Sequence, residues 1–540
     1  MTESLKSPPL ALPANIASTH AMLGAVHWQR AVTELKATGA TFLTLWGADN
    51  CDRNSGFSIH AAFLTQAGVE VLSHEIESVS HPTYPSVANL FPAAARMERA
   101  TYDLLGIAST APDRQLDQRP WLRHDAWSAT TFPLRRDAIV PKEEGVISTG
   151  ARSAEWRDPR ISAATTPYPF VQVEGDGVHE IAVGPVHAGI IEPGHFRFSV
   201  VGEKVIRLEE RLGYTHKGVA KLFESLAQSE GHRLAARISG DSTVAFSWAY
   251  CAALEAITAT AVPARAAHLR ALALEHERLA NHLGDLGALG NDAGFAFGLT
   301  QFSRLKEDLL RTNLEAFGAR YLFDTILPGG VATDLPRASY AHLIHFYRDL
   351  EHEVAGLRLI YDEHGGLQDR FREAGILTNE RAVELGAIGL AARASGIAQD
   401  LRADHPWAPY NILATQIVTE TAGDVAARVQ VRFREIVESL RLCRTLLADL
   451  SHTSVEARPI ATTVPTAEPN RLGIGVIEGW RGPVLIALET GVDGAIRRCH
   501  AHDPSWQNWP LLEYAILGNI VPDFPLINKS FNLSYSGPDG

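Results

Sequence analysis

The alternation of apolar and polar positions divides the chain into parts of different character. From about residue 25 to residue 107, short apolar runs alternate with turn residues, and three runs are rich in β-branched or aromatic residues (41–47, 58–64 and 69–76). This pattern is typical of strands joined by turns and predicts a small α+β domain. The next part, 108–165, is rich in Pro, Asp, Arg and Trp without a sustained period, which indicates an extended connector.

Strand patterns return between about 166 and 207, and most of the remainder has helical periodicity. Apolar residues recur at intervals of three and four, which predicts helices at 218–236, 241–262, 265–289, 301–323, 336–364, 379–403 and 422–452. The segment 471–500 alternates again around Gly479 and Arg481-Gly482-Pro483, which indicates a β-hairpin. The predicted fold class is α+β, with a small N-terminal α+β domain and a mainly α-helical domain that carries small β elements.

Composition narrows the function without identifying it. Of the 540 residues, 46% are hydrophobic and 21% are charged, values typical of a globular protein with a large core. The net charge of −13 argues against a general nucleic-acid-binding protein, which would carry a basic surface. The most apolar stretch, 244–262, is rich in Ala and Thr and contains Glu255, so we expect a buried helix rather than a membrane span. Any association with a membrane would then depend on partner subunits.

The four cysteines are far apart in the chain: Cys51, Cys251, Cys443 and Cys499. No two have a metal-binding spacing such as C-x-x-C, so the chain cannot supply the clustered thiolates that hold an iron–sulfur cluster. Sparse, unpaired cysteines also suggest a reducing compartment. His276-Glu277 and His282 invite comparison with a zinc protease, but such a site needs histidines four positions apart, and these are six apart.

A stripe of polar residues follows one face of the predicted helix 265–289 and extends past its end. Its members are separated by three, four, three and seven positions: Glu275, Arg278, His282, Asp285 and Asp292. If one helix runs through all of them, they share a face. One interpretation is a solvated face. The other is a partly buried ion network, because burying unpaired charge costs several kcal/mol. Gly284, Gly287 and Gly290 would allow close approach by another backbone, and such a helix is suited to form a wall of a proton or redox cavity.

Several motifs in the first part of the chain resemble the 30-kDa accessory subunit of complex I. They are His81-Pro82-Thr83-Tyr84-Pro85-Ser86, Phe91-Pro92-Ala93-Ala94, Glu98-Arg99, Tyr102-Asp103-Leu104-Leu105-Gly106-Ile107 and Pro133-Leu134-Arg135-Arg136-Asp137. The resemblance implies a domain that packs beside the quinone-site subunit and carries no cofactor.

The second part resembles the 49-kDa subunit of complex I, which descends from the large subunit of nickel–iron hydrogenases. The motifs are Val183-Gly184-Pro185-Val186-His187, Glu192-Pro193-Gly194-His195-Phe196-Arg197, Leu212-Gly213-Tyr214-Thr215-His216-Lys217-Gly218, Glu275-His276-Glu277-Arg278 with His282, Leu327-Pro328-Gly329-Gly330-Val331 and Asp523-Phe524-Pro525-Leu526-Ile527. A fusion of the two halves is the arrangement of the formate-hydrogenlyase large subunit and hydrogenase-4 component G family. The implied organisation is a disordered or extended N-terminus (1–24), the 30-kDa-like domain (25–137), a connector (138–170) and the hydrogenase-like domain (171–540).

The four cysteine ligands of a nickel–iron centre are missing from the positions that match them. The first pair falls at Ser239 and Ser242, and the second pair at Ser534 and Gly537. Thiolate sulfur suits nickel and iron in a way that a hydroxyl does not. We therefore predict no metal site in this chain and no hydrogenase activity. The glutamate that passes protons in such hydrogenases is also replaced, by Ala220.

Complex I lost the same cysteines and uses the vacated cavity for quinone, which a histidine and a tyrosine hold. Those two positions are Pro193 and Gly240 here, whereas the aspartate that supports the histidine is matched by Asp292. Quinone binding is thus implied by analogy alone. The candidates for proton transfer are Asp292, His187 and His216, with His195 nearby, although each histidine taken singly is more often a packing residue. The candidates for the lining of the vacated cavity are Arg197, Arg237, Ser239, Gly240, Ser242, Ser534 and Asp539.

Two hypotheses follow for the whole chain. In the first, it is a subunit of a complex-I-like redox complex on the cytoplasmic face of the cell membrane and binds no cofactor itself. Electrons would arrive from an iron–sulfur partner subunit, quinone or another small molecule would accept them, and proton uptake through the polar stripe would drive antiporter-like membrane subunits. In the second, the chain is a non-catalytic scaffold between the iron–sulfur subunit and the membrane subunits. A ligand-binding or regulatory role is a third possibility.

Overall fold

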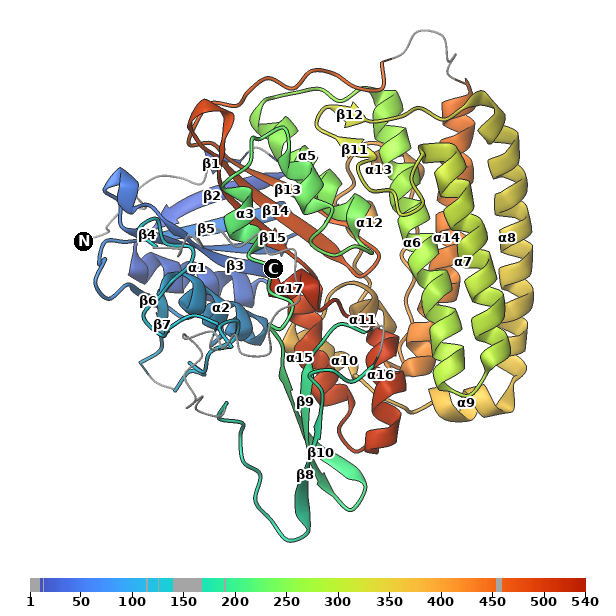
Figure 1. Ribbon diagram of the computed structural model, residues 1–540, viewed down its shortest axis with the longest axis horizontal. Helices are drawn as coiled ribbons and strands as arrows, with labels where there is room; N and C mark the ends of the chain where they lie inside the picture. The colour runs from blue at the N-terminus through green and yellow to red at the C-terminus, as the bar shows by residue number, and fades with distance from the viewer. Residues whose placement is uncertain are drawn as a thin grey trace, which may run out of the picture.

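The computed structural model describes residues 10–12, 14–112, 115–124, 126–138, 168–188, 191–452 and 459–540. Figure 1 shows a sheet-rich N-terminal region at one side of the molecule and a bundle of long helices at the other. A layer between them contains a small sheet and the C-terminal helices, and a narrow three-stranded sheet projects from this layer. The predicted α+β fold class is confirmed.

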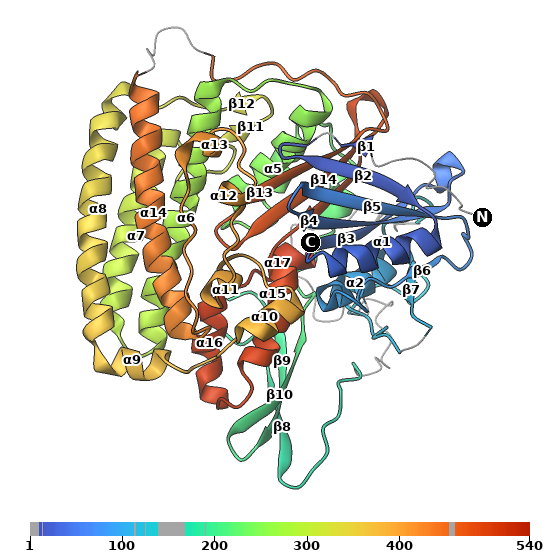
Figure 2. The same ribbon diagram turned by 180° about the vertical axis from the view of Figure 1, so that it is seen from behind.

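The N-terminal region is built on a five-stranded sheet in the order β1-β2-β5-β4-β3. Its strands are β1 (Leu10–Ala11), β2 (Ser18–Leu23), β3 (Thr41–Asp49), β4 (Phe57–Thr65) and β5 (Gly68–Ile76). Strands β3, β4 and β5 are antiparallel neighbours, and β2 runs parallel to β5. Helices α1 (Ala25–Ala37) and α2 (Ala95–Leu105) pack against the sheet (Figure 2). All three predicted strands are present, and the sheet begins before the expected boundary at residue 25.

Two smaller sheets follow along the chain. Strands β6 (Thr83–Pro85) and β7 (Ala108–Thr110) form a short parallel pair. The projecting sheet is antiparallel and consists of β8 (Val178–Val183), β9 (His195–Val201) and β10 (Lys204–Arg211). Most of the expected connector, from residue 139 to residue 167, lies outside the described residues.

Four long helices form the bundle: α6 (Ala264–Asp292), α7 (Ala296–Phe317), α8 (Arg337–Glu363) and α14 (Val425–His452). The buried helix α5 (Thr243–Ile257) lies between the bundle and the central sheet, and its Glu255 pairs with Arg270 at 2.6 Å. The shorter elements around the bundle are α9 (Gly365–Phe371), α13 (Tyr410–Leu413), β11 (Ile326–Leu327) and β12 (Gly330–Val331). No helix in the described ranges combines the length and the apolar character that crossing a membrane requires.

Two of the predicted helices are wrong as continuous helices. The segment 218–236 forms only α3 (Val219–Phe223) and α4 (Gly231–Ala235), because the backbone between them pairs with a distant segment. Gln228 N–H donates to the carbonyl of Gly494 at 2.8 Å. The segment 379–403 forms α10 (Asn379–Leu385), α11 (Gly389–Ala394) and α12 (Leu401–Asp404). Gly386 and Gly389 break it, since both have a positive φ and a Cβ on Gly389 would overlap the carbonyl of Arg481.

The C-terminal segment completes the central layer. The predicted hairpin is present as β13 (Leu472–Glu478) and β14 (Pro483–Thr490), and a third strand, β15 (Ile496–His502), extends it. The final helices are α15 (Ser505–Ala515), α16 (Phe524–Phe531) and α17 (Ser536–Asp539). Strand β15 packs on β3 of the N-terminal sheet, where the Trp46 ring stacks on His60 at one side and on His500 at the other, at 5.1 and 5.0 Å between centroids. The two halves of the chain are thus in direct contact.

Candidate functional site

The four positions that the resemblance matches to the cysteine ligands, which we call the former ligand positions, lie together, although one pair is nearly 300 residues from the other. They are Ser239, Ser242, Ser534 and Gly537. Ser242 caps the start of α5, and Ser534 and Gly537 flank the turn into α17. Gly537 N–H donates to Ser534 Oγ at 2.9 Å, and Ser534 Oγ is 3.0 Å from Ser239 Oγ. Ser239 Oγ in turn donates to Asp241 Oδ1 at 2.7 Å. A directed chain of hydrogen bonds therefore closes the space between the two pairs.

An ion pair covers this chain of hydrogen bonds on the side of the central sheet. Arg481, in the turn between β13 and β14, donates from both terminal nitrogens to the carboxylate of Asp241, at 2.7 and 2.6 Å. Its guanidinium lies 4.0 Å from the centroid of the Trp480 ring, and one nitrogen is 3.4 Å from Ser242 Oγ. Packing around Asp241 opposes ionisation, but Arg481 and Ser239 outweigh it and hold the pKa of this carboxyl below its usual range.

The fourth position has no room for a cysteine side chain. A Cβ built on Gly537 would overlap the carboxylate of Asp503, which is 1% exposed. Asp503 Oδ2 has no hydrogen-bond partner among the described residues, and burial raises the pKa of its carboxyl. Nowhere in the described ranges do three or more His, Cys, Asp or Glu side chains form a group that could hold a metal ion. With hydroxyls at three positions and a carboxylate in the space of the fourth, these residues do not fit a nickel–iron centre.

The polar stripe lies on one continuous helix, as the spacing predicts, and four of its five members are buried. It faces α14, which runs antiparallel to α6 and supplies the partners. Asp285 pairs with Arg432 at 2.8 Å, His282 with Glu435 at 2.7 Å, and Glu275 with Ser439 at 2.7 Å. Arg278 lies between two carboxylates, 3.5 Å from Glu275 and 3.8 Å from Glu435. The stripe is therefore an ion network and not a solvated face. We call these contacts the α6–α14 ladder.

Buried groups from α11, α12 and β13 extend the ladder sideways. Arg393 donates to Glu435 at 2.7 Å and to Glu478 at 3.0 Å. Arg402 pairs with Asp400 at 2.7 Å and with Glu275 at 3.0 Å, and Tyr410 also donates to Glu275. The network contains five carboxyls, Glu275, Asp285, Asp400, Glu435 and Glu478, and four guanidiniums, Arg278, Arg393, Arg402 and Arg432. Burial, followed by the charge of Asp400, raises the pKa of Glu478 to about 7.

Asp292 does not join this network. It ends α6, and both of its carboxylate oxygens lie 2.7 Å from the amine of Lys529 on α16. Asp285, two turns earlier, is the stripe residue that reaches the former ligand positions, because Asn532 donates to it and lies two residues before Ser534.

Two of the candidate histidines lie beside the loop that precedes β9. The His187 ring stacks on Phe196 and its Nε2 is 3.4 Å from the hydroxyl of Tyr535, which follows Ser534 in the chain. His195 Nδ1 donates to the carbonyl of Gly184 at 3.2 Å. Burial lowers the pKa of both histidines. The structure thus brings His187 close to the ligand positions through one aromatic residue.

Three candidates for the cavity lining point elsewhere. Arg197 pairs with Glu180 at 2.9 Å within the projecting sheet. Arg237 makes a two-fold contact with Asp324 on the surface, at 2.9 Å for each bond. Gly240 is exposed, although its neighbours Ser239 and Asp241 belong to the closed cluster. Of the predicted lining residues, Ser239, Ser242 and Ser534 therefore lie together. Arg197, Arg237 and Gly240 do not join them.

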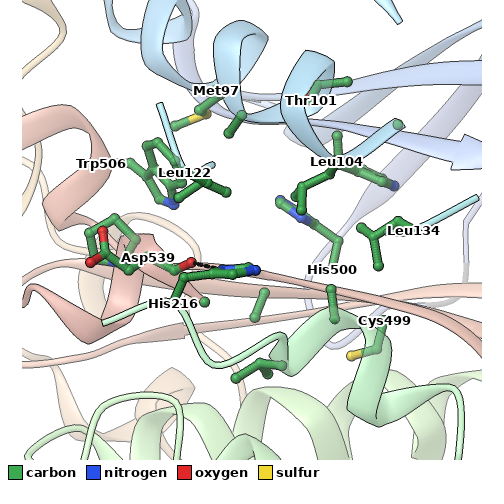
Figure 3. Close-up of a pocket in the computed structure, with 18 of the residues that line it drawn as sticks. Met97, Thr101, Leu104, Leu122, Leu134, His216, Cys499, His500, Trp506 and Asp539 are labelled. Atoms are coloured by element: carbon green, nitrogen blue, oxygen red, sulfur yellow. Dashed lines mark hydrogen bonds between the residues drawn. The ribbon is translucent and has the colours of Figure 1, made fainter. Parts of the chain in front are cut away.

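A cavity lies next to the ligand positions, between the two halves of the chain (Figure 3). It has a volume of about 90 Å³ and is lined from α2, β3, α3, β15, α15 and α17. His216 donates from Nδ1 to the backbone carbonyl of Asp539 at 2.7 Å, so two predicted residues meet in its wall. The Asp539 carboxylate accepts from Gly213 N, Thr215 N and Thr215 Oγ1, and burial raises its pKa to about 6. Ala220 and Gly537 also line the cavity, so it borders two of the five positions that the resemblance matches to functional groups of hydrogenases.

The sequence reasoning missed three residues that define the former metal position. Asp241 stands between the two serines of the first pair, and this place in the sequence is the only sign that it belongs to the site. Arg481 was noticed only as part of a turn, and nothing in the sequence linked Asp503 to Gly537.

Comparison with known proteins identifies both halves. Residues 22–144 match the family model "Respiratory-chain NADH dehydrogenase, 30 Kd subunit", and residues 292–472 match "Respiratory-chain NADH dehydrogenase, 49 Kd subunit". Among solved structures, one chain of the membrane-bound sulfane sulfur reductase, an archaeal respiratory membrane complex, shares the fold. It superimposes with a TM-score of 0.63 over 67% of this chain and 99% of that chain, at 24% sequence identity.

Two relatives from Escherichia coli (strain K12) cover almost the whole chain. Formate hydrogenlyase subunit 5 is 30% identical over 505 residues, which are 93% of this chain and 85% of that protein. Hydrogenase-4 component G is 30% identical over 500 residues, which are 92% of this chain and 83% of that protein. The chain therefore belongs to the family of fused 30-kDa-like and 49-kDa-like complex I subunits that includes formate hydrogenlyase subunit 5 and hydrogenase-4 component G.

Proposed function

We propose that this chain is a subunit of a membrane-associated, complex-I-like redox complex that works without a nickel–iron centre. In this proposal it lies on the cytoplasmic face through partner subunits. An iron–sulfur partner subunit supplies electrons to quinone or another small acceptor, and this chain couples the transfer to proton movement. The polar network along α6 and α14 is the part of the chain that handles the protons.

The observation that carries the proposal is the excess carboxyl in the α6–α14 network. Five carboxyls face four guanidiniums, while burial keeps the pKa of His282 low and its ring neutral. Burial of an unpaired charge costs several kcal/mol, so the network favours one resident proton, held at Glu478. A group that keeps a proton near neutral pH can exchange it when the charge nearby changes. The network begins at Asp285, beside the former ligand positions, where such a change would be felt most strongly.

The same geometry argues against hydrogen chemistry. The hydroxyls of Ser239 and Ser534 bond to each other, and Asp503 fills the space that a fourth thiolate would need. We expect the purified complex to contain no nickel attributable to this chain and to evolve no hydrogen. Nickel in a one-to-one ratio with the chain, or hydrogen evolution that depends on it, would contradict this part of the proposal.

The second candidate is a scaffold that only joins the iron–sulfur subunit to the membrane subunits. The closed hydrogen-bond chain from Gly537 to Asp241 favours it, because a working acceptor site would leave space at the former metal position. A scaffold does not need a network that exchanges protons. The two candidate functions therefore differ in whether the α6–α14 network handles protons.

Substituting Glu478→Gln in the assembled complex separates them. Gln keeps the shape and one acceptor oxygen but cannot release a proton. Under the proposal, assembly is normal, electron transfer continues, and proton translocation measured in proteoliposomes falls severalfold. The matched control is Glu420→Gln, which removes a half-exposed partner of Arg434 and should leave translocation unchanged. Asp292→Asn is a second test at the other end of α6.

The two candidate functions predict different results for these substitutions. Normal assembly with unchanged turnover and unchanged proton translocation in both Glu478→Gln and Asp292→Asn supports the scaffold. Loss of translocation in Glu478→Gln alone supports proton handling by the network and leaves Asp292 a structural partner of Lys529.

A further inference from the structure

The cavity between the two halves has the features of a binding site for a small molecule. Its wall is mainly apolar, with side chains such as Leu45, Met97, Leu104 and Phe223. The volume of about 90 Å³ holds on the order of six water molecules, when one water needs roughly 15 Å³ of such space. An apolar cavity of roughly 150 Å³ holds benzene, so a single substituted ring would enter this smaller space only with some movement of its wall.

Trp506 presents an unused hydrogen-bond donor in this wall. The residue is only 8% exposed, and its indole N–H has no acceptor within the described parts of the chain. Trp509, one turn further along α15, donates to the carbonyl of Ser534 at 2.9 Å. Trp506 has no such partner among the residues described, so its indole N–H is available to an acceptor on a ligand in the cavity.

His500 presents a second polar atom from another wall of the cavity. Its Nε2 is 2.7 Å from Thr44 Oγ1, and its ring stacks on Trp46, which together fix its orientation. Its Nδ1 has no partner among the residues that the structure describes. Burial holds the pKa of His500 well below its usual range, so the ring is neutral and Nδ1 either donates or accepts, according to its tautomer. Figure 3 shows Trp506 and His500 entering the pocket from different sides, with His216 between them.

The charged groups of the wall are already occupied by the protein. Arg498 donates to the carbonyls of Gly47 and Cys499 at 3.4 and 3.1 Å, and Asp539 accepts three hydrogen bonds. One cation and one carboxyl line the space, so an ionic ligand would bring a charge that nothing balances. Burying such a charge costs several kcal/mol, which excludes an anion or a cation as the preferred occupant.

We propose that this cavity binds a small uncharged molecule of about one ring, mainly apolar, with a hydroxyl or carbonyl group that meets Trp506 and His500. Part of the space for it exists because the side chain of Ala220 is a single methyl group. The proposal is independent of the proton-handling role above, since it rests on residues outside the α6–α14 network.

Phenol is a suitable probe, with toluene and benzoate as comparison ligands. Each is titrated into the full-length chain and binding is measured by calorimetry, with the total tryptophan fluorescence as a second signal. We expect saturable binding of phenol, about fivefold weaker binding of toluene, and the weakest binding of benzoate. The fivefold difference corresponds to one hydrogen bond of about 1 kcal/mol.

Two variants locate the site. Ala220→Leu places three more carbons in the cavity and should weaken phenol binding at least tenfold, whereas Ala37→Leu on the exposed end of α1 should leave it unchanged. Trp506→Phe removes the N–H donor together with the five-membered part of the indole ring, so the readout is the ratio of the affinities for phenol and toluene, which should fall from about fivefold to about one. If Ala220→Leu fails to fold, Trp506→Phe and the phenol–toluene comparison decide the matter.

Three results would overturn the proposal. They are the absence of saturable phenol binding, an unchanged ratio of phenol affinity to toluene affinity in the Trp506→Phe variant, and tighter binding of benzoate than of phenol. The last result would instead make Arg498 the centre of an anion site.

Discussion

The α6–α14 ladder and the former ligand positions meet at the Asp285–Asn532 hydrogen bond, yet they hold polar groups in opposite ways. In the ladder, long charged side chains are fully buried and reach partners on another helix. At the ligand positions, short hydroxyls bond directly to one another and a single ion pair lies at the edge. A charged group of the ladder that loses its partner has no alternative partner inside the protein. The serine hydroxyls, in contrast, could exchange hydrogen-bond partners at small cost. We therefore expect substitutions in the ladder to affect stability far more than substitutions at the ligand positions.

Removing Arg393 should have the largest effect. Arg393→Met removes the ion-pair partner of Glu478 and leaves Glu435 with only the more distant Arg278 in a fully buried site, so the free energy of unfolding should fall by about 3–5 kcal/mol. Denaturant unfolding followed by circular dichroism measures it. The control is Arg434→Met on α14, whose pair with Glu420 is half-exposed and worth less than about 1 kcal/mol. Equal losses of unfolding free energy in the two variants would show that burial does not distinguish the ion pairs of the ladder from exposed ion pairs.

Glu277 lies between the two regions and should give a pH-dependent effect. Its carboxyl accepts from Val244 N and Ala245 N at the start of α5, and burial raises its pKa from 4.5 to about 8. Between these values the folded chain keeps a proton that the unfolded chain releases, so this residue makes stability fall as pH rises across the window.

Glu277→Gln tests this linkage because Gln stays uncharged at every pH. The slope of unfolding free energy against pH between 4.5 and about 8 should become less negative, by up to ~1.4 kcal/mol per pH unit. Denaturant unfolding at a series of pH values measures it. Parallel curves for the variant and the parent chain would show that Glu277 ionises normally.

A side chain at the fourth ligand position should cost less than the loss of Arg393. Gly537→Ala pushes a methyl group into the Asp503 carboxylate, so we expect a loss of about 1–3 kcal/mol in the free energy of unfolding. Gly356→Ala is the control, because a Cβ there has nothing within 4 Å and lies in the middle of α8. That change should raise stability by up to about 1 kcal/mol. A neutral Gly537→Ala would mean that Asp503 moves freely and that the space is not filled.

The smallest effect is expected at the serines. Ser239→Ala removes the bonds to Ser534 and Asp241, while Arg481 still holds Asp241, so the loss should be about 1 kcal/mol. Thermal unfolding is sensitive enough to detect it. A loss as large as that of Arg393→Met would remove the distinction between the two regions.

The parts of the fold that depend on local periodicity could be predicted from the sequence. The strands at 41–49, 57–65 and 68–76 and the long helices of the bundle follow from apolar spacing within each segment. The helices expected at 218–236 and 379–403 failed for one shared reason. Gln228 pairs with Gly494, and Gly389 packs on Arg481, so segments that are distant in sequence decide the local conformation.

The same division applies to the candidate site. The resemblance located Ser239, Ser242, Ser534 and Gly537, because each lies in a recognisable motif. It could not reveal that Arg481, 240 residues from Asp241, covers them, or that Asp503 takes the space beside Gly537. The cavity was also beyond prediction, since its walls come from both halves of the chain and only their packing creates it.

The stack of His60, Trp46 and His500 has a consequence for how the chain is made. The hydrogen bond between His500 and Thr44 joins residues 456 positions apart. A ribosome that adds roughly 5–20 residues per second needs about half a minute to a minute and a half to synthesise that stretch. During this time the Trp46 surface of the N-terminal sheet has been made but its cover has not. Fusing the two halves into one polypeptide fixes their ratio at one to one. It also leaves an apolar surface of the first half exposed until the second half has been synthesised. This is the situation in which a nascent chain most needs a chaperone.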